Sequence, residues 1–453
     1  MRAGHSSSRP EAGGSLGQEL CELSGARILL VGNTPPPHGG VAMHVQALYE
    51  KLHALDAWVR VLSLGAHHSG PSIQGVKSAS ALASELSSYA LLGFLPHLHM
   101  SGHTLKSWLI AAAVAALRLP RGKGALLTLH SGMVPRFFES QPRALRASFG
   151  HIARRFSAIL AVNAEVAEAV RSLGVASSKI RVLAAGFIPG APEPAPRGLE
   201  LLRQRSTPLI VSAIADGPIY GARELIRALP CLMARFPRVG LALFGPCPTA
   251  PLQELARELG VLERVAFLGE LSHARSLGTM ARGDVFLRAT RADGDAISVR
   301  EALCLGKPVA ASRVGERPEA AHLFEPGDVP GMCEAIASAW AAARHTNRVD
   351  VALDARARAE ADLAQVLASY LALLDRAPLP ERWPSRRSAA SALAALPERV
   401  CEQRNEARLD RLVATDPFGK PVENRLNVDT LTCPFRGELN AIIDAPRLEG
   451  KAN

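Results

Sequence analysis

The chain has 453 residues, of which 48% are hydrophobic and 21% charged; this composition is typical of soluble globular proteins, and the length predicts two or three domains. The seven cysteines are scattered, odd in number and without a CxxC pair, which argues against a disulfide framework and a zinc site and for a reducing compartment. Aromatic residues make up only 5% and no nucleic-acid-binding motif is present, so we expect no nucleic-acid partner.

The N-terminal segment gives no targeting signal. Residues 1–18 are polar and rich in Gly and Ser, without an apolar core of signal-peptide length, and we predict a disordered leader over residues 1–24. The longest apolar run, residues 108–117, is too short to cross a bilayer and predicts a buried helix. We therefore expect a cytoplasmic protein.

The positive charge is unevenly distributed. The formal net charge is +10, and within residues 118–155 eight basic side chains are offset locally by Glu139 alone. These eight are Arg118, Arg121, Lys123, Arg136, Arg143, Arg146, Arg154 and Arg155. Two interpretations are open: a solvated helix face, or attraction to a phosphorylated acceptor or to the anionic inner face of a membrane.

In the first half of the chain, buried strands alternate with amphipathic helices. Residues 27–31 form a continuous apolar run typical of a buried parallel strand, and Asn163 is placed to cap a helix over residues 164–173. The other predicted elements are strands at 59–64, 125–129, 158–162 and 180–183, helices at 41–55, 80–92, 106–117 and 143–156, and the end of a strand at 96–99.

The second half repeats this alternation after a stretch rich in Pro and Gly, residues 186–197, which predicts an inter-domain linker. The predicted strands are 208–213, 240–244, 265–269, 284–290 and one that starts with residues 309–311. The predicted helices are 222–235, 252–259, 274–280, 298–305, 330–344 and 351–374. The predicted fold class is α/β, with two doubly wound Rossmann-like domains facing across a cleft. Their predicted bounds are 25–190 and 191–377, followed by a tail of low order at 378–453.

The stretch from Arg288 to Ser312 carries the strongest functional signal. Its loop follows a buried strand and opens onto a helix N-terminus, at the sheet edge where open α/β sheets bind ligands. The carboxylates of Asp293 and Glu301 suit a ligand with hydroxyls and phosphate, because carboxylates accept hydrogen bonds from hydroxyls and backbone N–H groups receive phosphate oxygens. The spacing Ser298-x-x-Glu301 also predicts a capping box with Ser298 as N-cap, and the two interpretations are compatible.

Two weaker signals lie in the first half. Gly39 and Gly40 separate the first strand from a helix N-terminus, which predicts either an anion cradle or a tight turn that needs positive φ. His130 follows directly after a buried strand, so it either points into the same crevice or is a structural histidine. The sequence leaves both alternatives open.

Four features occur in a characteristic order along the chain: the glycine pair, His130, the turn Phe267-Leu268-Gly269 and the motif from Asp293 to Pro308. In this order they resemble the retaining glycosyltransferases of the two-Rossmann (GT-B) type, called family 4 or group 1. The resemblance spans roughly residues 26–377. It implies an enzyme that moves a sugar from a nucleotide diphosphate sugar to a glycan or lipid-linked acceptor with retention of configuration. It also implies that no metal and no cofactor is needed.

The resemblance assigns roles to individual residues. His130 would lie beside the transferred sugar, Asp293 would accept hydrogen bonds from its hydroxyls, and Glu301 would bind the ribose; these three are the predicted catalytic residues. The predicted donor-binding residues are Gly39, Gly40, Arg288, Gly294, Asp295, Ala296, Ser298 and Arg300. The sequence Asp293-Gly-Asp295 spells DxD, but it lies where the family has its Glu, so no metal site is predicted.

One segment departs from the family. Soon after the first strand of the second domain the family has an Arg and then a Lys that bind the diphosphate, whereas this chain has Ile214 or Ala215 and then Tyr220. Because an uncompensated buried charge is heavily penalised, other cations have to take over. The candidates are Arg223, Arg288, Arg291 and Arg300.

This departure leaves two alternatives to a transferase open. One is a non-catalytic binding or scaffold protein with the same fold, and the other is a nucleotide-sugar epimerase. A nicotinamide-dependent dehydrogenase is disfavoured, because no GxGxxG sequence follows Val31.

Overall fold

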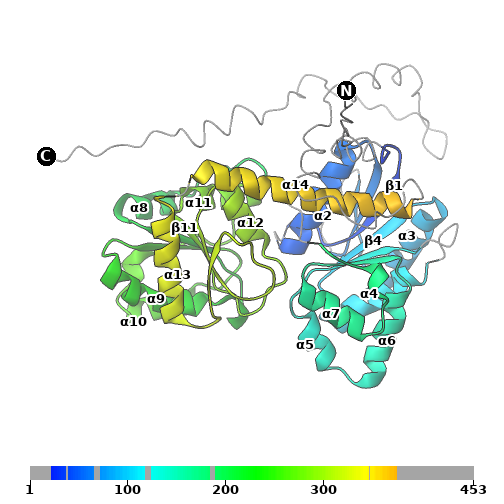
Figure 1. Cartoon of the computed structure of the whole chain (residues 1–453), viewed down its shortest axis with the longest axis horizontal. Helices are drawn as coiled ribbons and strands as arrows, with labels where there is room; N and C mark the ends of the chain where they lie inside the picture. Colours follow the sequence, from blue (N-terminus) through cyan, green and yellow to red (C-terminus); the bar gives the residue numbers. More distant parts are fainter. Residues whose placement is uncertain are drawn as a thin grey trace, which may run out of the picture. The chain divides into compact units, whose positions relative to one another are not determined.

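The computed structural model describes residues 22–36, 39–65, 72–117, 124–183, 189–345 and 347–374 (Figure 1). Most of the predicted leader and all of the predicted tail lie outside these residues. The described part contains two parallel sheets, each covered by helices, as the alternation of strands and helices predicts. The predicted α/β fold class is confirmed, whereas the domain bounds stay predictions.

The first sheet has the strand order β3-β2-β1-β4-β5-β6-β7. Its strands are β1 (Arg27–Gly32), β2 (Trp58–Ser63), β3 (Ile73–Gly75), β4 (Leu95–Met100), β5 (Leu126–Leu129), β6 (Ala158–Ala161) and β7 (Ile180–Val182). Its helices are α2 (Gly40–Ala54), α3 (Ala79–Leu91), α4 (Leu105–Ala115), α5 (Val134–Glu139), α6 (Arg143–Arg154) and α7 (Ala164–Ser172). The order reverses between β1 and β4, so the loops after these two strands open at a switch point, where such sheets bind ligands.

The second sheet has the order β10-β9-β8-β11-β12-β13. Its strands are β8 (Leu209–Ala213), β9 (Gly240–Phe244), β10 (Val265–Phe267), β11 (Val285–Arg288), β12 (Val309–Ser312) and β13 (Ala321–Phe324). The helices are α8 (Arg197–Arg205), α9 (Ala222–Arg235), α10 (Ala250–Glu258), α11 (His273–Arg282), α12 (Ile297–Cys304), α13 (Val329–Ala342) and α14 (Arg348–Leu373). Here the switch point lies between β8 and β11, so the loops after these strands face each other.

Apolar side chains cover both faces of the second sheet. Val285 and Leu287 of β11 belong to one buried cluster with α9, α10 and α13, whereas Phe286 between them belongs to another with α8, α11 and α12. Figure 1 shows these two sets of helices on opposite sides of the sheet. Both faces of a central strand are therefore buried, which explains the continuous apolar runs in the sequence.

Some elements differ from the prediction. The sequence patterns miss β3, β13, α5 and α8, which are short, and α8 begins at Arg197, where the predicted linker ends. The prediction that residues 108–117 form a buried helix is wrong in part, because α4 buries Trp108 and Val114 but leaves Leu109 73% exposed. Among the described helices, none is both long and apolar enough to cross a membrane.

Candidate active site

Asp293, in the loop after β11, lies at the centre of a partly buried ion-pair cluster. Its Oδ2 accepts hydrogen bonds from Nε of Arg288 at 3.2 Å, Nη2 of Arg317 at 3.3 Å and the hydroxyl of Thr290 at 3.1 Å. Burial opposes ionisation, but the two guanidinium groups outweigh it, so the pKa of Asp293 lies below its usual range. At neutral pH this side chain is therefore a carboxylate that accepts hydrogen bonds.

Glu301 is buried in α12 and faces the start of α11. Its Oε1 lies 2.6 Å from Nε2 of His273, the first residue of α11, and the N-terminus of a helix favours a nearby carboxylate. The predicted capping box is wrong. The N-cap of α12 is Ala296, which makes no side-chain cap, and Ser298 lies inside the helix. The carboxylate of Glu301 therefore points toward another element rather than back to its own helix start.

Arg300 connects α12 to α14. Its Nε donates to both carboxylate oxygens of Asp295, at 2.7 and 2.9 Å, and its Nη1 lies 3.5 Å from Oδ2 of Asp362 on α14. Burial works against the charge of the guanidinium group, but Asp295 and Asp362 outweigh burial and raise the pKa of Arg300. Both aspartates of the sequence Asp293-Gly-Asp295 thus form ion pairs with arginines.

The glycine pair begins α2 as predicted. Gly40 is the first helical residue and Gly39 its N-cap, with φ −82°, so the alternative of a turn that needs positive φ is wrong for Gly39. A Cβ at Gly40 would lie 3.8 Å from Cδ1 of Ile297, and Met43 packs against the same side chain. The start of α2 therefore lies beside the start of α12, and two neighbouring helix N-termini favour an anionic ligand.

Three buried histidines, His44 on α2 and His97 and His99 on β4, lie close to the partly buried His130, which follows β5. Nδ1 of His99 lies 3.3 Å from Nε2 of His130, and the ring of His44 has its centroid 5.3 Å from that of His99 and 5.0 Å from that of His130. Burial lowers the pKa of all four rings, that of His44 to about 4. His130 is therefore a neutral hydrogen-bonding group at neutral pH.

Within the described residues, His44, His99 and His130 are the group that could hold a metal ion, because one ring nitrogen from each lies within 4.8 Å of the others. Neutral imidazole is a common metal ligand. However, His99 and His130 already share a hydrogen bond, which a metal would have to displace.

The loops that carry His130 and Asp293 touch. Asn163 caps α7 through Oδ1, as predicted, while its Nδ2 donates to the carbonyl of Gly294 at 3.0 Å. A Cβ added at Gly132 would overlap the carbonyl oxygen of Asp293, and one added at Gly294 would overlap that of His130. Only glycine allows so close an approach, and the predicted catalytic loops are thereby brought together.

The four candidate substitute cations lie in different surroundings. Arg288 lies over the ring of Tyr220, with 5.7 Å from its guanidinium carbon to the ring centroid. Arg291 is exposed and pairs with Glu224, 2.5 Å away, and Arg223 is exposed on α9. Arg300 is held by its two aspartates. Arg288 thus places its guanidinium group against Tyr220 of the departing segment, whereas Arg291 contacts this segment through its backbone N–H, which donates to the carbonyl of Ile219 at 2.7 Å.

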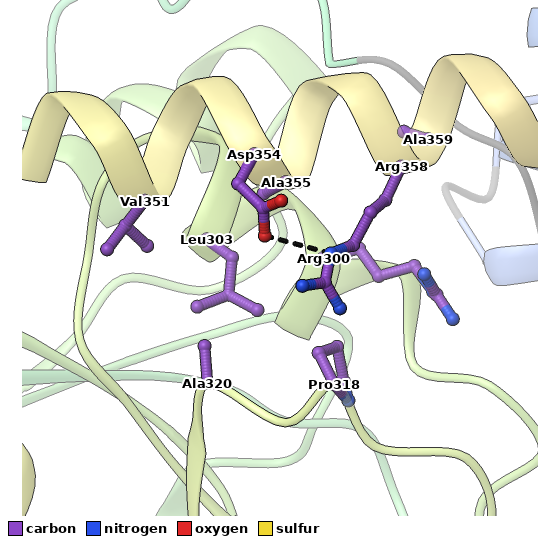
Figure 2. Close-up of a pocket in the computed structure, with 9 residues that line it drawn as sticks. All are labelled: Arg300, Leu303, Pro318, Ala320, Val351, Asp354, Ala355, Arg358 and Ala359. Atoms are coloured by element: carbon purple, nitrogen blue, oxygen red, sulfur yellow. Dashed lines mark ion pairs between the residues drawn. The ribbon is translucent and has the colours of Figure 1, made fainter. Parts of the chain in front are cut away.

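A separate pocket lies between α12 and α14 (Figure 2). The lining comprises Arg300 and Leu303 of α12, the loop before β13 and one side of α14. On α14, Arg358 pairs with Asp354 one turn earlier, at 2.8 Å. Neither Asp293 nor Glu301 lines this pocket. The pocket therefore contains Arg300, one of the predicted donor-binding residues, but neither of the two predicted carboxylates.

No sequence pattern singled out Arg317, His273, His44 or His99. Arg317 and His273 bind the predicted carboxylates from positions 24 and 28 residues away. His99 lies at the end of a predicted strand. The same position relative to a strand singled out His130, so it could also have indicated His99 as a candidate site residue. Arg317 and His273 lie outside the motif and carried no such signal.

Comparison with known proteins agrees with this geometry. Residues 38–188 match the family described as "Glycosyltransferase Family 4", and residues 205–342 match "Glycosyl transferases group 1". Together the two matched ranges cover more than half of the 453 residues. The chain belongs to the group 1 and family 4 glycosyltransferases. The resemblance of the motifs is thus confirmed.

Among curated members of the family, the chain is similar to a GDP-mannose-dependent alpha-(1-6)-phosphatidylinositol monomannoside mannosyltransferase of Mycolicibacterium smegmatis. The identity is 35% over 141 residues, 28% of this chain and 36% of the relative. A phosphatidyl-myo-inositol mannosyltransferase of the same organism is 32% identical over 129 residues, 27% of this chain and 33% of the relative. The chain thus matches about a third of the length of these relatives.

Solved structures share the two-sheet fold. The Anabaena protein HepE in complex with UDP has a TM-score of 0.58 at 20% identity, over 76% of this chain and 99% of that chain. Sucrose-phosphate synthase from Thermosynechococcus elongatus has a TM-score of 0.59 at 17% identity, over 78% of this chain and 100% of that chain. At such identities the likeness establishes the GT-B fold alone.

Proposed function

We propose that this protein is a glycosyltransferase that takes a sugar from a nucleotide diphosphate sugar. The observation that carries the proposal is the placement of Glu301, a buried carboxylate beside His273, in the same β-loop-α unit as the Asp293 cluster. A carboxylate suits ribose hydroxyls, and the neighbouring starts of α2 and α12 suit phosphate. Family membership supports this assignment.

In this proposal each residue acts at a different part of the donor. Glu301 binds the ribose, and Asp293 orients the sugar. The two arginines at Asp293, Arg288 and Arg317, and the helix N-termini offset the charge that develops on the departing diphosphate. His130 is neutral because it is buried, so it can donate or accept a hydrogen bond without adding charge beside the sugar. Transfer would proceed with retention of configuration and without a metal ion.

We infer a glycan or lipid-linked acceptor. The names of two curated relatives specify phosphatidylinositol-type substrates. On this chain, α4 exposes Leu105 and Leu109 and packs against α6, where Arg143 and Arg154 are exposed. Apolar side chains beside basic ones suit an anionic lipid surface. Co-sedimentation with vesicles that contain anionic lipid, but not with neutral vesicles, is the expected result.

A donor screen tests the proposed function. Sugars linked to UDP, GDP and ADP are titrated into the protein by calorimetry, and at least one is expected to bind and to raise the melting temperature. Glu301→Gln is expected to lose that binding at least about tenfold, because a charge-assisted hydrogen bond is lost. The matched control is Glu325→Gln, an exposed glutamate of the same domain that pairs with Arg313. Failure of every donor to bind would overturn the proposal.

A non-catalytic binding protein is the second candidate, favoured by Tyr220 where the family has a lysine. Donor binding without product, over a panel of glycan and lipid-linked acceptors, would support it. An epimerase is distinguished by incubation without acceptor, since only an epimerase converts the donor to its epimer. The anomeric configuration of any product, read by NMR, tests retention.

A further inference from the structure

The loop after β8 lacks the cation that a diphosphate donor needs. From Ile214 to Gly221 it contains one acid, Asp216, and neither Lys nor Arg. A nucleotide diphosphate carries negative charge at the group that leaves, and this charge grows during transfer. The cation therefore has to come from outside this loop, and the β11 side of the second sheet lies across the switch point from it.

Arg288 extends from the end of β11 into that space. Its Nη1 donates to the carbonyl of Ala213, the last residue of β8, at 3.4 Å, and its guanidinium group lies over the ring of Tyr220. It is therefore anchored at both ends of the cation-free loop. Its side chain keeps 14% of its surface exposed, so a ligand can reach it.

Arg317 binds the carboxylate of Asp293, which also accepts a hydrogen bond from Arg288. Its side chain is only 3% exposed, and its guanidinium group donates to the carbonyls of Ser312 and Glu316 at 3.1 and 3.0 Å and to Asp293. Two guanidinium groups thus share the carboxylate of Asp293, and these three side chains together keep one excess positive charge. Without Arg317, the carboxylate would cancel the charge of Arg288.

The other arginines are less suited. Arg300 is held by two carboxylates, Arg291 is an exposed partner of Glu224, and Arg223 is exposed on α9. We propose that Arg288 binds the donor diphosphate in this chain, and that Arg317 is a positioning residue that offsets the charge of Asp293. This inference rests on the proposed function, because it assigns the phosphate subsite of the same donor.

Calorimetry with a nucleoside diphosphate and its parent nucleoside isolates the subsite. Both compounds carry the nucleoside of the donor that binds the wild-type protein. The measured quantity is the affinity for the nucleoside diphosphate divided by the affinity for the nucleoside. Arg288→Gln is expected to lower this preference for the diphosphate at least about tenfold while nucleoside affinity stays unchanged. Arg288→Lys, which keeps the charge but not the planar fork, is expected to fall between wild type and Arg288→Gln.

A rescue experiment tests the role of Arg317. Arg317→Gln is expected to lower the preference for the diphosphate, because Asp293 then offsets Arg288. Adding Asp293→Asn to that variant is expected to restore the preference for the diphosphate. No such recovery is expected if Arg317 has a purely structural role. Arg235→Gln is the matched control, since it removes the same charge at the far end of α9, where Arg235 pairs with Glu334.

The outcomes separate the two claims. If wild type binds neither a nucleotide sugar nor a nucleoside diphosphate, the proposed function fails and this inference fails with it. If wild type binds and folded Arg288→Gln, checked by its melting curve, keeps the full preference for the diphosphate, only this inference fails. An absence of rescue by Asp293→Asn would overturn the role of Arg317.

Discussion

The buried histidines predict that acid destabilises the first domain. His44 on α2 faces His99 and His130. The ring of His97 lies tilted against that of His99 and is hydrogen-bonded to Tyr370, so no carboxylate is among these partners. Burial lowers the pKa of His44 from 6.5 to about 4. Between these two pH values, His44 of the unfolded chain binds a proton that the folded chain does not bind. The contribution of neutral His44 to stability is therefore fully present above the unfolded pKa and is lost as pH falls from 6.5 toward about 4.

The magnitude follows from the shift. A separation between 6.5 and about 4 is worth roughly 3 kcal/mol once pH has fallen below both values. Between about pH 7.5 and about pH 5.0, His44 alone is expected to remove about 2 kcal/mol from the free energy of unfolding. The lowered pKa values of His97, His99 and His130 act in the same direction.

Urea unfolding followed by tryptophan fluorescence measures this effect, because Trp108 lies in the core of the same domain. His44→Gln removes the titrating ring, so its loss of stability between the two pH values should be smaller than that of wild type by about 2 kcal/mol. His151→Gln, on the exposed side of α6, is the control and should behave as wild type. An equal pH dependence in wild type and His44→Gln would refute the reasoning.

Three individual contacts and the proposed metal-independent chemistry predict four more effects. Tyr370→Phe leaves Nδ1 of His97 without its buried partner and should cost about 1–3 kcal/mol of stability in urea unfolding; no change would contradict that bond. Gly221→Ala should destabilise by more than about 2 kcal/mol, because φ is +68° and the new Cβ would overlap the carbonyl oxygen of Ala289; a melting curve like that of wild type would be inconsistent with this backbone. Arg300→Met should cost about 3–5 kcal/mol, because it leaves two aspartates without their shared cation, and a neutral result would show the ion pairs to be dispensable. Donor binding and transfer should survive EDTA, and a loss that Mg²⁺ or Mn²⁺ restores would contradict metal-independent chemistry.

The fold was accessible from the sequence because its signals are local. Apolar runs of strand length alternate with helical spacing, and α9 and β9 have the predicted bounds, 222–235 and 240–244. The cap by Asn163 was predictable for the same reason, since it spans three residues. Elements of three to six residues, such as β3 and α5, bury too few side chains to show a period, so they were missed.

From the sequence, the loop and helix that carry Asp293 and Glu301 were predictable, but the partners of these carboxylates were not. The spacing of Ser298 and Glu301 fits both a capping box and a ligand carboxylate, and the deciding group, His273, lies on another helix. Likewise, the charge of Asp293 depends on Arg317, which approaches from the loop after β12. Periodicity and spacing describe neighbours along one element, whereas these contacts join different elements, so no local pattern could reveal them.

Helix α14 shows why such contacts matter for function. Asp362 on this helix reaches Arg300 beside the donor loop, and Tyr370, about two turns later, donates or accepts the 2.6 Å hydrogen bond to His97 beneath the histidine cluster. The same helix therefore supports both the carboxylate loop that carries Asp293 and the sheet that positions His130. The sequence predicts only a helix in this segment, because its partners lie 62 and 273 residues away along the chain. In the folded protein, the stability of α14 and the geometry of the two predicted catalytic regions depend on the same buried polar contacts.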